Sequence, residues 1–125
     1  MITYKFNKEI GILETFIKEV VSIKDFIEYI ISISEDQSLP DVLKIYTDAS
    51  EGRFSSEVKP EDLPKIVEVN NLHLAKRKRI IDAFTLSGSM ETALGQLYME
   101  LSKADNYKFK IFSTKDAAIV WLNNF

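Results

Sequence analysis

The sequence predicts an α/β fold in which one domain, residues 1–125, holds a five-stranded mixed sheet in the order β-β-α-β-α-β-α-β-α. Three observations lead to this prediction. Segments with an apolar period of two alternate with segments of period three to four. The helical segments are long enough for crossovers between parallel strands. A chain of 125 residues, with 46% hydrophobic and 28% charged residues, suits one globular domain.

The first three elements come from the N-terminal 35 residues. Ile2, Tyr4 and Phe6 alternate with polar residues, as in a half-buried strand. A short turn lets residues 10–17 pair back as a hairpin. Ser22 is a predicted N-cap of a helix whose apolar residues recur every three or four positions: Ile23, Phe26, Ile27, Ile30 and Ile31.

The middle of the chain predicts a strand, a loop and a helix. Val42–Thr47 has the composition of a strand, and we expect Asp48–Phe54 to be a loop in which Gly52 forms a turn. Pro60 suits the first turn of a second helix, which we expect to run to about Arg77.

The last four elements follow the same alternation. Ile80–Leu86 predicts a strand, and Ser87–Ser89 a helix start with both Met90 and Met99 in the core. Tyr107–Phe112 predicts the final strand, and Ser113 caps the final helix. We therefore expect four parallel strands with the first strand added antiparallel.

The side-chain pattern of the strands predicts helices mainly on one face of the sheet. The predicted helix-covered face is the more apolar one and carries Leu13, Ile17, Leu43, Ile45, Ile81, Ala83, Phe109 and Ile111. The opposite face mixes aromatic and charged residues: Glu14, Phe16, Lys44, Tyr46, Asp82, Phe84, Lys108, Lys110 and Phe112. We expect this second face to be partly solvated or covered by a partner.

Charge and composition narrow the functional classes. The net charge of −3 does not favour nucleic acid as a partner, and the basic run Lys76–Arg79 is typical of a solvated helix end. The sequence contains no cysteine, signal-peptide pattern or apolar stretch of membrane-span length. A cytoplasmic location without a membrane span is the expectation.

Catalytic patterns are not evident. His73 is the only histidine and lies in the second predicted helix, where packing is the simpler role. No phosphate-binding glycine motif and no metal-ligand cluster occurs, so we expect neither a cofactor nor a metal. An enzyme would have to use Asp48, Ser50, Arg53 or His73 without a visible catalytic base.

Polar residues gather instead at the predicted carboxyl edge of the sheet. Asp48, Ser50, Arg53 and Phe54 come from one loop, and Ser87, Gly88 and Ser89 precede the third helix. We call these seven residues the rim. Two readings are open: the helix N-terminus and Arg53 bind an anionic ligand, or the serines only cap and turn the chain.

The order of elements and the segment Tyr107–Leu122, YKFKIFSTKDAAIVWL, resemble the STAS domain superfamily and its SpoIIAA-like group. Anti-sigma-factor antagonists of this group carry a D-S-[ST]-G pattern whose first hydroxyl is phosphorylated. In this sequence Ala49 holds that position, and Ser50 corresponds only to the next one. Phosphorylation of Ser50 is therefore not expected.

The expected function is non-enzymatic binding of a protein partner or a small ligand, with a regulatory role and a homodimer left open. The alternative implied by the resemblance is a Sec14-like carrier of a small molecule or lipid. This alternative requires an apolar pocket near Phe54 and Ser87.

Overall fold

A computed structural model describes all 125 residues and confirms the α/β class and the order of elements. The strands are β1 (Ile2–Asn7), β2 (Ile12–Val21), β3 (Val42–Phe54), β4 (Arg79–Leu86) and β5 (Tyr107–Phe112). The helices are α1 (Ile23–Glu35), α2 (Leu63–Leu74), α3 (Ser89–Leu101) and α4 (Lys115–Leu122), with the short 3-10 turn η1 (Pro60–Asp62) before α2.

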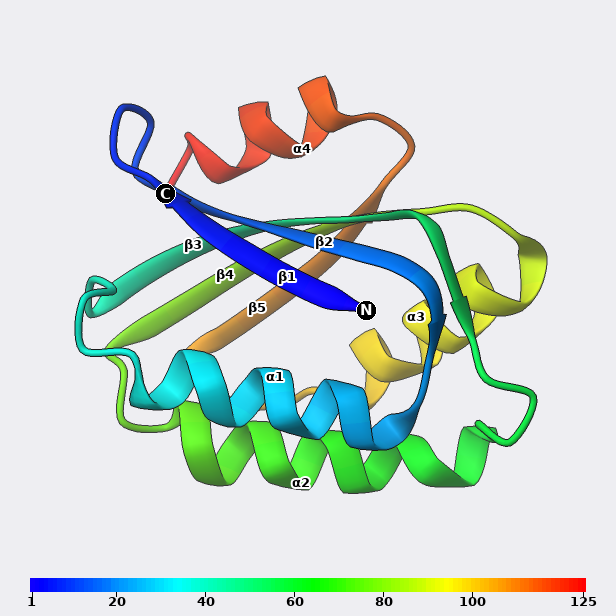
Figure 1. Ribbon diagram of the computed structural model, residues 1–125. Helices are drawn as coiled ribbons and strands as arrows, with labels where there is room; N and C mark the ends of the chain where they lie inside the picture. The colour runs from blue at the N-terminus through cyan, green and yellow to red at the C-terminus, as the bar shows by residue number, and fades with distance from the viewer.

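The five strands form one sheet in the order β1-β2-β3-β4-β5. β1 pairs antiparallel to β2, and the other neighbours are parallel, as the crossover connections predict. Figure 1 shows α1, α2 and α3 on one side of this sheet and α4 on the other. The helices thus lie mainly on one face.

Most predicted helix starts agree with the structure. Ser22 caps α1, since its Oγ accepts a hydrogen bond from Asp25 N while Asp25 accepts one from Ser22 N. The prediction for the last helix was one residue early: Thr114, not Ser113, accepts the hydrogen bond from Ala117 N. Asp116 lies in the first turn of α4, where an acidic residue suits the helix dipole.

The predicted faces of β4 are the reverse of those observed. Ile45 lies beside Asp82 and Tyr46 beside Ala83, so Asp82 shares the face covered by α1, α2 and α3. Ile81 and Ala83 lie instead on the face covered by α4. Apolar residues occur on both faces of β4, so a period of two shows which residues share a face but not which face lies inward.

α4 covers part of the mixed aromatic and charged face of the sheet, which was expected to be partly solvated or covered by a partner. Its Ala118 and Leu122 are fully buried against Ile12, Tyr46 and Ile81. The phenol of Tyr46 shares a buried hydrogen bond of 2.8 Å with Thr85 Oγ1. The chain's own last helix therefore covers this part of the sheet.

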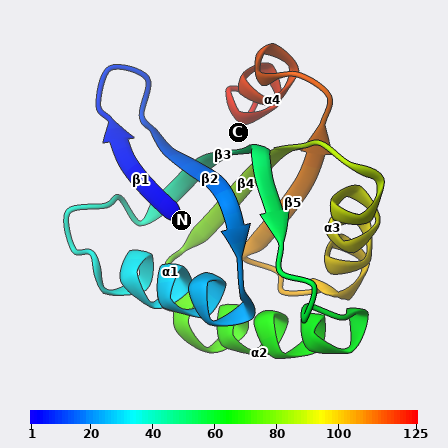
Figure 2. The same cartoon turned by 45° about the vertical axis from the view of Figure 1, so that its right-hand side comes forward.

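The segment expected to be a loop, Asp48–Phe54, is the second half of β3. It stays paired with β2 as far as Val21 and Phe54, past a register shift between Phe16 and Lys18. Figure 2 shows this end of both strands curving down toward α1 and α2. The pairing of β3 with β4 ends earlier, at Ala49 and Leu86, so the last part of β3 pairs with β2 alone.

Arg77, in the basic run after α2, has a structural role. Its two Nη atoms donate hydrogen bonds of 2.7–3.2 Å to four carbonyl oxygens at and beyond the end of α1: those of Ile33, Asp36, Leu39 and Pro40. The run was expected to be the solvated end of its own helix, but Arg77 instead caps the end of α1.

Two methionines predicted to lie in the core are at the surface. Met90 is 45% exposed and Met99 is 39% exposed, both on α3. Leu94 is the buried residue of that helix. α3 thus contributes a narrower apolar face than its sequence indicates.

Candidate functional site

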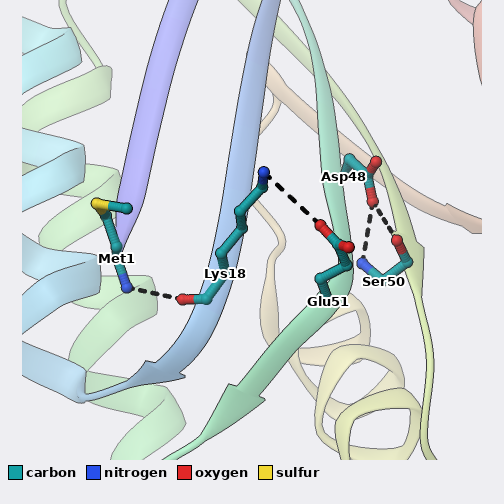
Figure 3. A network of polar contacts seen from close by, with 5 residues as sticks. All are labelled: Met1, Lys18, Asp48, Ser50 and Glu51. Carbon is teal, nitrogen blue, oxygen red and sulfur yellow. Dashed lines mark hydrogen bonds and ion pairs between the residues drawn. The ribbon is translucent and has the colours of Figure 1, made fainter.

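The rim is held by short-range polar contacts on β3. Asp48 Oδ1 accepts hydrogen bonds from Ser50 N at 3.0 Å and from Ser50 Oγ at 2.6 Å. Figure 3 shows this pair beside an ion pair of 3.8 Å between Lys18 of β2 and Glu51 of β3. The N-terminal amine of Met1 donates to the carbonyl oxygen of Lys18, which joins β1 to the same network. The Ser50 hydroxyl is already engaged by its neighbour Asp48.

The structure brings the two halves of the rim together at one contact. Ser87 Oγ donates to the carbonyl oxygen of Ser50. Gly88 is the N-cap of α3 with φ of +87°, a conformation that favours glycine. The expectation that these segments are neighbours is met, although one of them is a strand.

An acidic side chain lies at the N-terminus of α3. A Cβ added to Gly88 would lie 2.5 Å from Oε1 of Glu91, so that carboxylate folds back over the first turn. It occupies the region where an anion would be stabilised by the helix dipole. Anion binding by Ser87, Gly88, Ser89 and Arg53 stays a prediction, and Glu91 weighs against it.

Gly52 does not form a turn but allows β2 and β3 to approach closely. A Cβ at this position would lie 2.7 Å from Cγ2 and 2.9 Å from the carbonyl oxygen of Ile17. Its strand neighbours differ in exposure: the Arg53 side chain is exposed, and Phe54 is half-buried and packs against Phe26 of α1 at a ring distance of 5.4 Å.

We expect Gly52→Ala to destabilise the protein by about 1–3 kcal/mol, because the backbone of Ile17 cannot move without breaking the β2 pairing. Urea unfolding followed by the fluorescence of Trp121 measures this. Gly95→Ala is the matched control, since the nearest atoms there are the flexible side-chain ends of Leu86 and Ile111. An equal loss in both variants would contradict the close strand approach at Gly52.

A cavity of about 70 Å³ lies inside the protein, between the sheet and helices α1, α2 and α3. It is partly open, and 15 of its 19 lining residues are hydrophobic. Phe54 and Leu86 belong to this lining, so an apolar pocket is present near the rim. Scaling from the cavity of about 150 Å³ that holds benzene, it has room for about three heavy atoms, and its open side admits a slightly longer molecule.

The polar group of most interest in the cavity is Asp82 of β4, which is 6% exposed. Its Oδ1 accepts a hydrogen bond of 3.2 Å from Thr47 Oγ1, and its Oδ2 a long one of 3.4 Å from the Tyr107 hydroxyl. Burial raises the pKa of Asp82 to about 8, and the two hydrogen bonds offset only part of this effect. Asp82 is therefore mostly protonated at neutral pH.

Tyrosines surround Asp82 from three elements. Tyr98 of α3 donates to the Tyr107 hydroxyl at 3.2 Å, and Tyr29 of α1 shares a 2.7 Å hydrogen bond with Thr15. Burial raises the pKa of Tyr29, Tyr98 and Tyr107, so all three are neutral at physiological pH. No lysine, arginine or histidine lines the cavity to balance the charge of an ionised Asp82.

Asn70 of α2 is the second polar residue of interest. It is 7% exposed and lines the cavity, yet its side-chain amide makes no hydrogen bond within the protein. Its amide atoms keep some accessible surface, since Arg77 Nε is the one fully buried side-chain polar atom without a partner. A donor and an acceptor are thus available inside the cavity for a bound molecule.

Sequence reasoning missed Asp82 and Asn70 as site residues, although each carries a signal. Asp82 is an acidic residue inside the apolar strand Ile80–Leu86, and charged residues are rarely buried without a reason. Asn70 falls on the buried stripe of α2, with Leu63, Ile66 and Leu74. A polar residue on an apolar stripe was the clue in both elements.

The other residue types considered for catalysis or metal binding do not come together in a site. His73 lies on α2, half-buried and outside the cavity lining. No group of three or more histidine, aspartate or glutamate residues is placed to hold a metal ion. No helix is both long and apolar enough to cross a membrane.

Comparison with known proteins gives one informative result. No family model matches the sequence, and no curated protein matches it. The structure superposes on the crystal structure of an uncharacterized protein from the DUF3478 family with a SpoIIAA-like fold, from Shewanella loihica PV-4. The TM-score is 0.59 at 16% sequence identity, over 98% of this chain and 92% of that chain. The chain has a SpoIIAA-like fold.

The residue directly after Asp48 is Ala49, where the D-S-[ST]-G pattern has its first hydroxyl. Ala49 is 4% exposed and packs with Ile17 and Val21. A buried methyl group replaces the hydroxyl that the resemblance would place there. Ser50 is exposed, and its hydroxyl donates a hydrogen bond to Asp48. The expectation that Ser50 is not phosphorylated stays a prediction.

Proposed function

We propose that this SpoIIAA-like protein is a non-enzymatic binding domain whose ligand is a small, mainly apolar molecule held in the interior cavity. The observation that carries the proposal is a cavity with apolar walls that also contains the unpartnered amide of Asn70 and the carboxyl group of Asp82. Apolar walls with a few convergent polar groups are typical of small-molecule sites. A carrier role and a regulatory role would each depend on such binding.

The position of the cavity supports ligand-dependent signalling to the surface. Its lining includes Phe54 at the end of β3 and Leu86 at the end of β4, next to the rim. A molecule that fills the cavity would contact Phe54 and Leu86, which pack with Ala49, the residue before Ser50. Apart from Phe54, which lines the cavity, the rim residues are in this proposal a surface that responds to occupancy and not the binding site itself.

The proposal is tested by titration with n-propanol, a four-atom probe that suits the cavity, followed by amide chemical shifts. We expect the largest shifts at lining residues such as Asn70, Leu94 and Gly95. Leu94→Phe, which adds volume inside the cavity, should abolish the shifts.

The matched control is Leu101→Phe, the same change on the same helix at a side chain that is 36% exposed and outside the lining. It should bind like the parent protein. Absence of shifts in the parent protein, or their persistence in Leu94→Phe, would overturn the cavity as the site.

A protein partner, a homodimer and a cytoplasmic location stay predictions from the sequence. Light scattering at several protein concentrations, with and without n-propanol, measures self-association. A mass of 14.4 kDa throughout would exclude the homodimer.

A further inference from the structure

The acidic character of the cavity is the starting point for a more specific assignment. Two lining residues carry ionisable carboxyl groups, Asp82 of β4 and Glu91 of α3, and no lining residue is basic. A ligand with an anionic head would meet two acidic groups and no cation. Fatty acids and phosphorylated molecules therefore match these walls poorly.

Asp82 lacks the counter-charge that a buried carboxylate needs. Its contacts are a threonine hydroxyl and a tyrosine hydroxyl, both uncharged. The titratable groups near it are Tyr29 from α1, Tyr98 from α3 and Tyr107 from β5, and the polar residue that α2 adds to the same lining is the neutral Asn70. A cation inside the cavity would supply the missing partner.

We infer that the ligand is a primary amine with a small apolar body, bound as an ammonium ion between the carboxylate of Asp82 and the amide oxygen of Asn70. This assignment rests on the proposed function and names the ligand class for the same cavity. The ammonium donates up to three hydrogen bonds, and the apolar body lies against the leucine, isoleucine and phenylalanine side chains of the walls.

Binding of an ammonium ion to this site must release a proton. The free protein holds Asp82 protonated below about pH 8, and the complex requires its carboxylate. The proton leaves Asp82 for the solvent when the ammonium enters. Amine affinity is therefore expected to rise about tenfold per pH unit from pH 6 to 8, and then to level off.

The test compares three probes that each contain three carbon atoms, n-propylamine, n-propanol and propionate, titrated by amide chemical shifts at pH 6, 7 and 8. We expect n-propylamine to bind at least tenfold more tightly than n-propanol at pH 8, and propionate to bind most weakly. The n-propanol affinity should not depend on pH.

Asp82→Asn should remove both the amine preference and its pH slope, so that n-propylamine then binds no more tightly than n-propanol at any of the three pH values. Asp105→Asn, at an exposed position outside the cavity, is the matched control and should keep both properties. Equal binding of amine and alcohol without a pH slope would overturn the amine assignment and leave the proposed function standing. Failure of all three probes to bind would overturn both.

Discussion

Wild-type protein should lose stability as the pH rises from 4 to 8, and Asp82→Asn should not show this loss. The pKa of Asp82 is about 8 in the folded protein because of burial, against an ordinary value of 3.8 for an exposed aspartate. Between these values the unfolded chain releases a proton that the native protein keeps. Asp82 therefore binds more protons in the folded protein than in the unfolded chain. The free energy of unfolding falls as the pH rises, by up to about 1.4 kcal/mol per pH unit.

The expected advantage of Asp82→Asn at pH 8 is about 2–5 kcal/mol, and it should shrink toward zero near pH 4. An asparagine matches the shape of the neutral carboxylic acid and carries no titratable proton, so it keeps the local packing. Above pH 8 the difference should level off, because both states of the wild-type chain are then ionised. The measurement is urea unfolding followed by Trp121 fluorescence at pH 5, 6.5 and 8.

Two surface carboxyl groups, those of Asp36 and Asp25, stabilise the protein more as the pH rises, which is opposite to the effect of Asp82. Hydrogen bonds from Ser38 lower the pKa of Asp36, and a backbone hydrogen bond from Ser22 lowers that of Asp25. Their stabilisation is lost when the pH falls below about 4, outside the range assigned to Asp82. Asp105→Asn serves as control. Parallel curves for wild type and Asp82→Asn from pH 5 to 8 would show that Asp82 ionises normally.

Arg77→Ala should destabilise the protein by about 2–4 kcal/mol, an effect comparable in size to that of Asp82→Asn at pH 8. The guanidinium joins the end of α1 and the start of β3 through four carbonyl oxygens, and its Nε is buried without a partner. Removal takes this donor from all four carbonyls, of which that of Asp36 keeps the backbone N–H of Leu39 at 3.3 Å. It also takes a positive charge from the negative end of the α1 dipole.

Arg77→Lys should recover little of this loss, since one ammonium cannot span carbonyls that two separate Nη atoms now reach. Lys76→Ala, in the same basic run but exposed, should change stability by less than about 0.5 kcal/mol. Hydrogen exchange should rise locally in the last turn of α1. A loss in Arg77→Ala no larger than in Lys76→Ala would refute the capping role.

Local residue patterns determined the elements and their order. The alternation of Ile2, Tyr4 and Phe6 specified a strand, Ser22 and Asp25 specified a helix start, and the helical segments between strands required parallel crossovers. These features depend on neighbours within a few residues, so one sequence suffices to read them.

Only the tertiary structure decided the inner face of β4, the end of β3 and the existence of the cavity. β4 carries apolar side chains on both faces, and the burial of Asp82 rather than Ile81 under α1, α2 and α3 follows from its register with β3. The polar segment Ser50–Phe54 remains a strand because β2 supplies its partner, a contact between residues about 33 positions apart. The cavity arises where three helices meet one sheet, and packing over such distances leaves no periodic signal in the sequence.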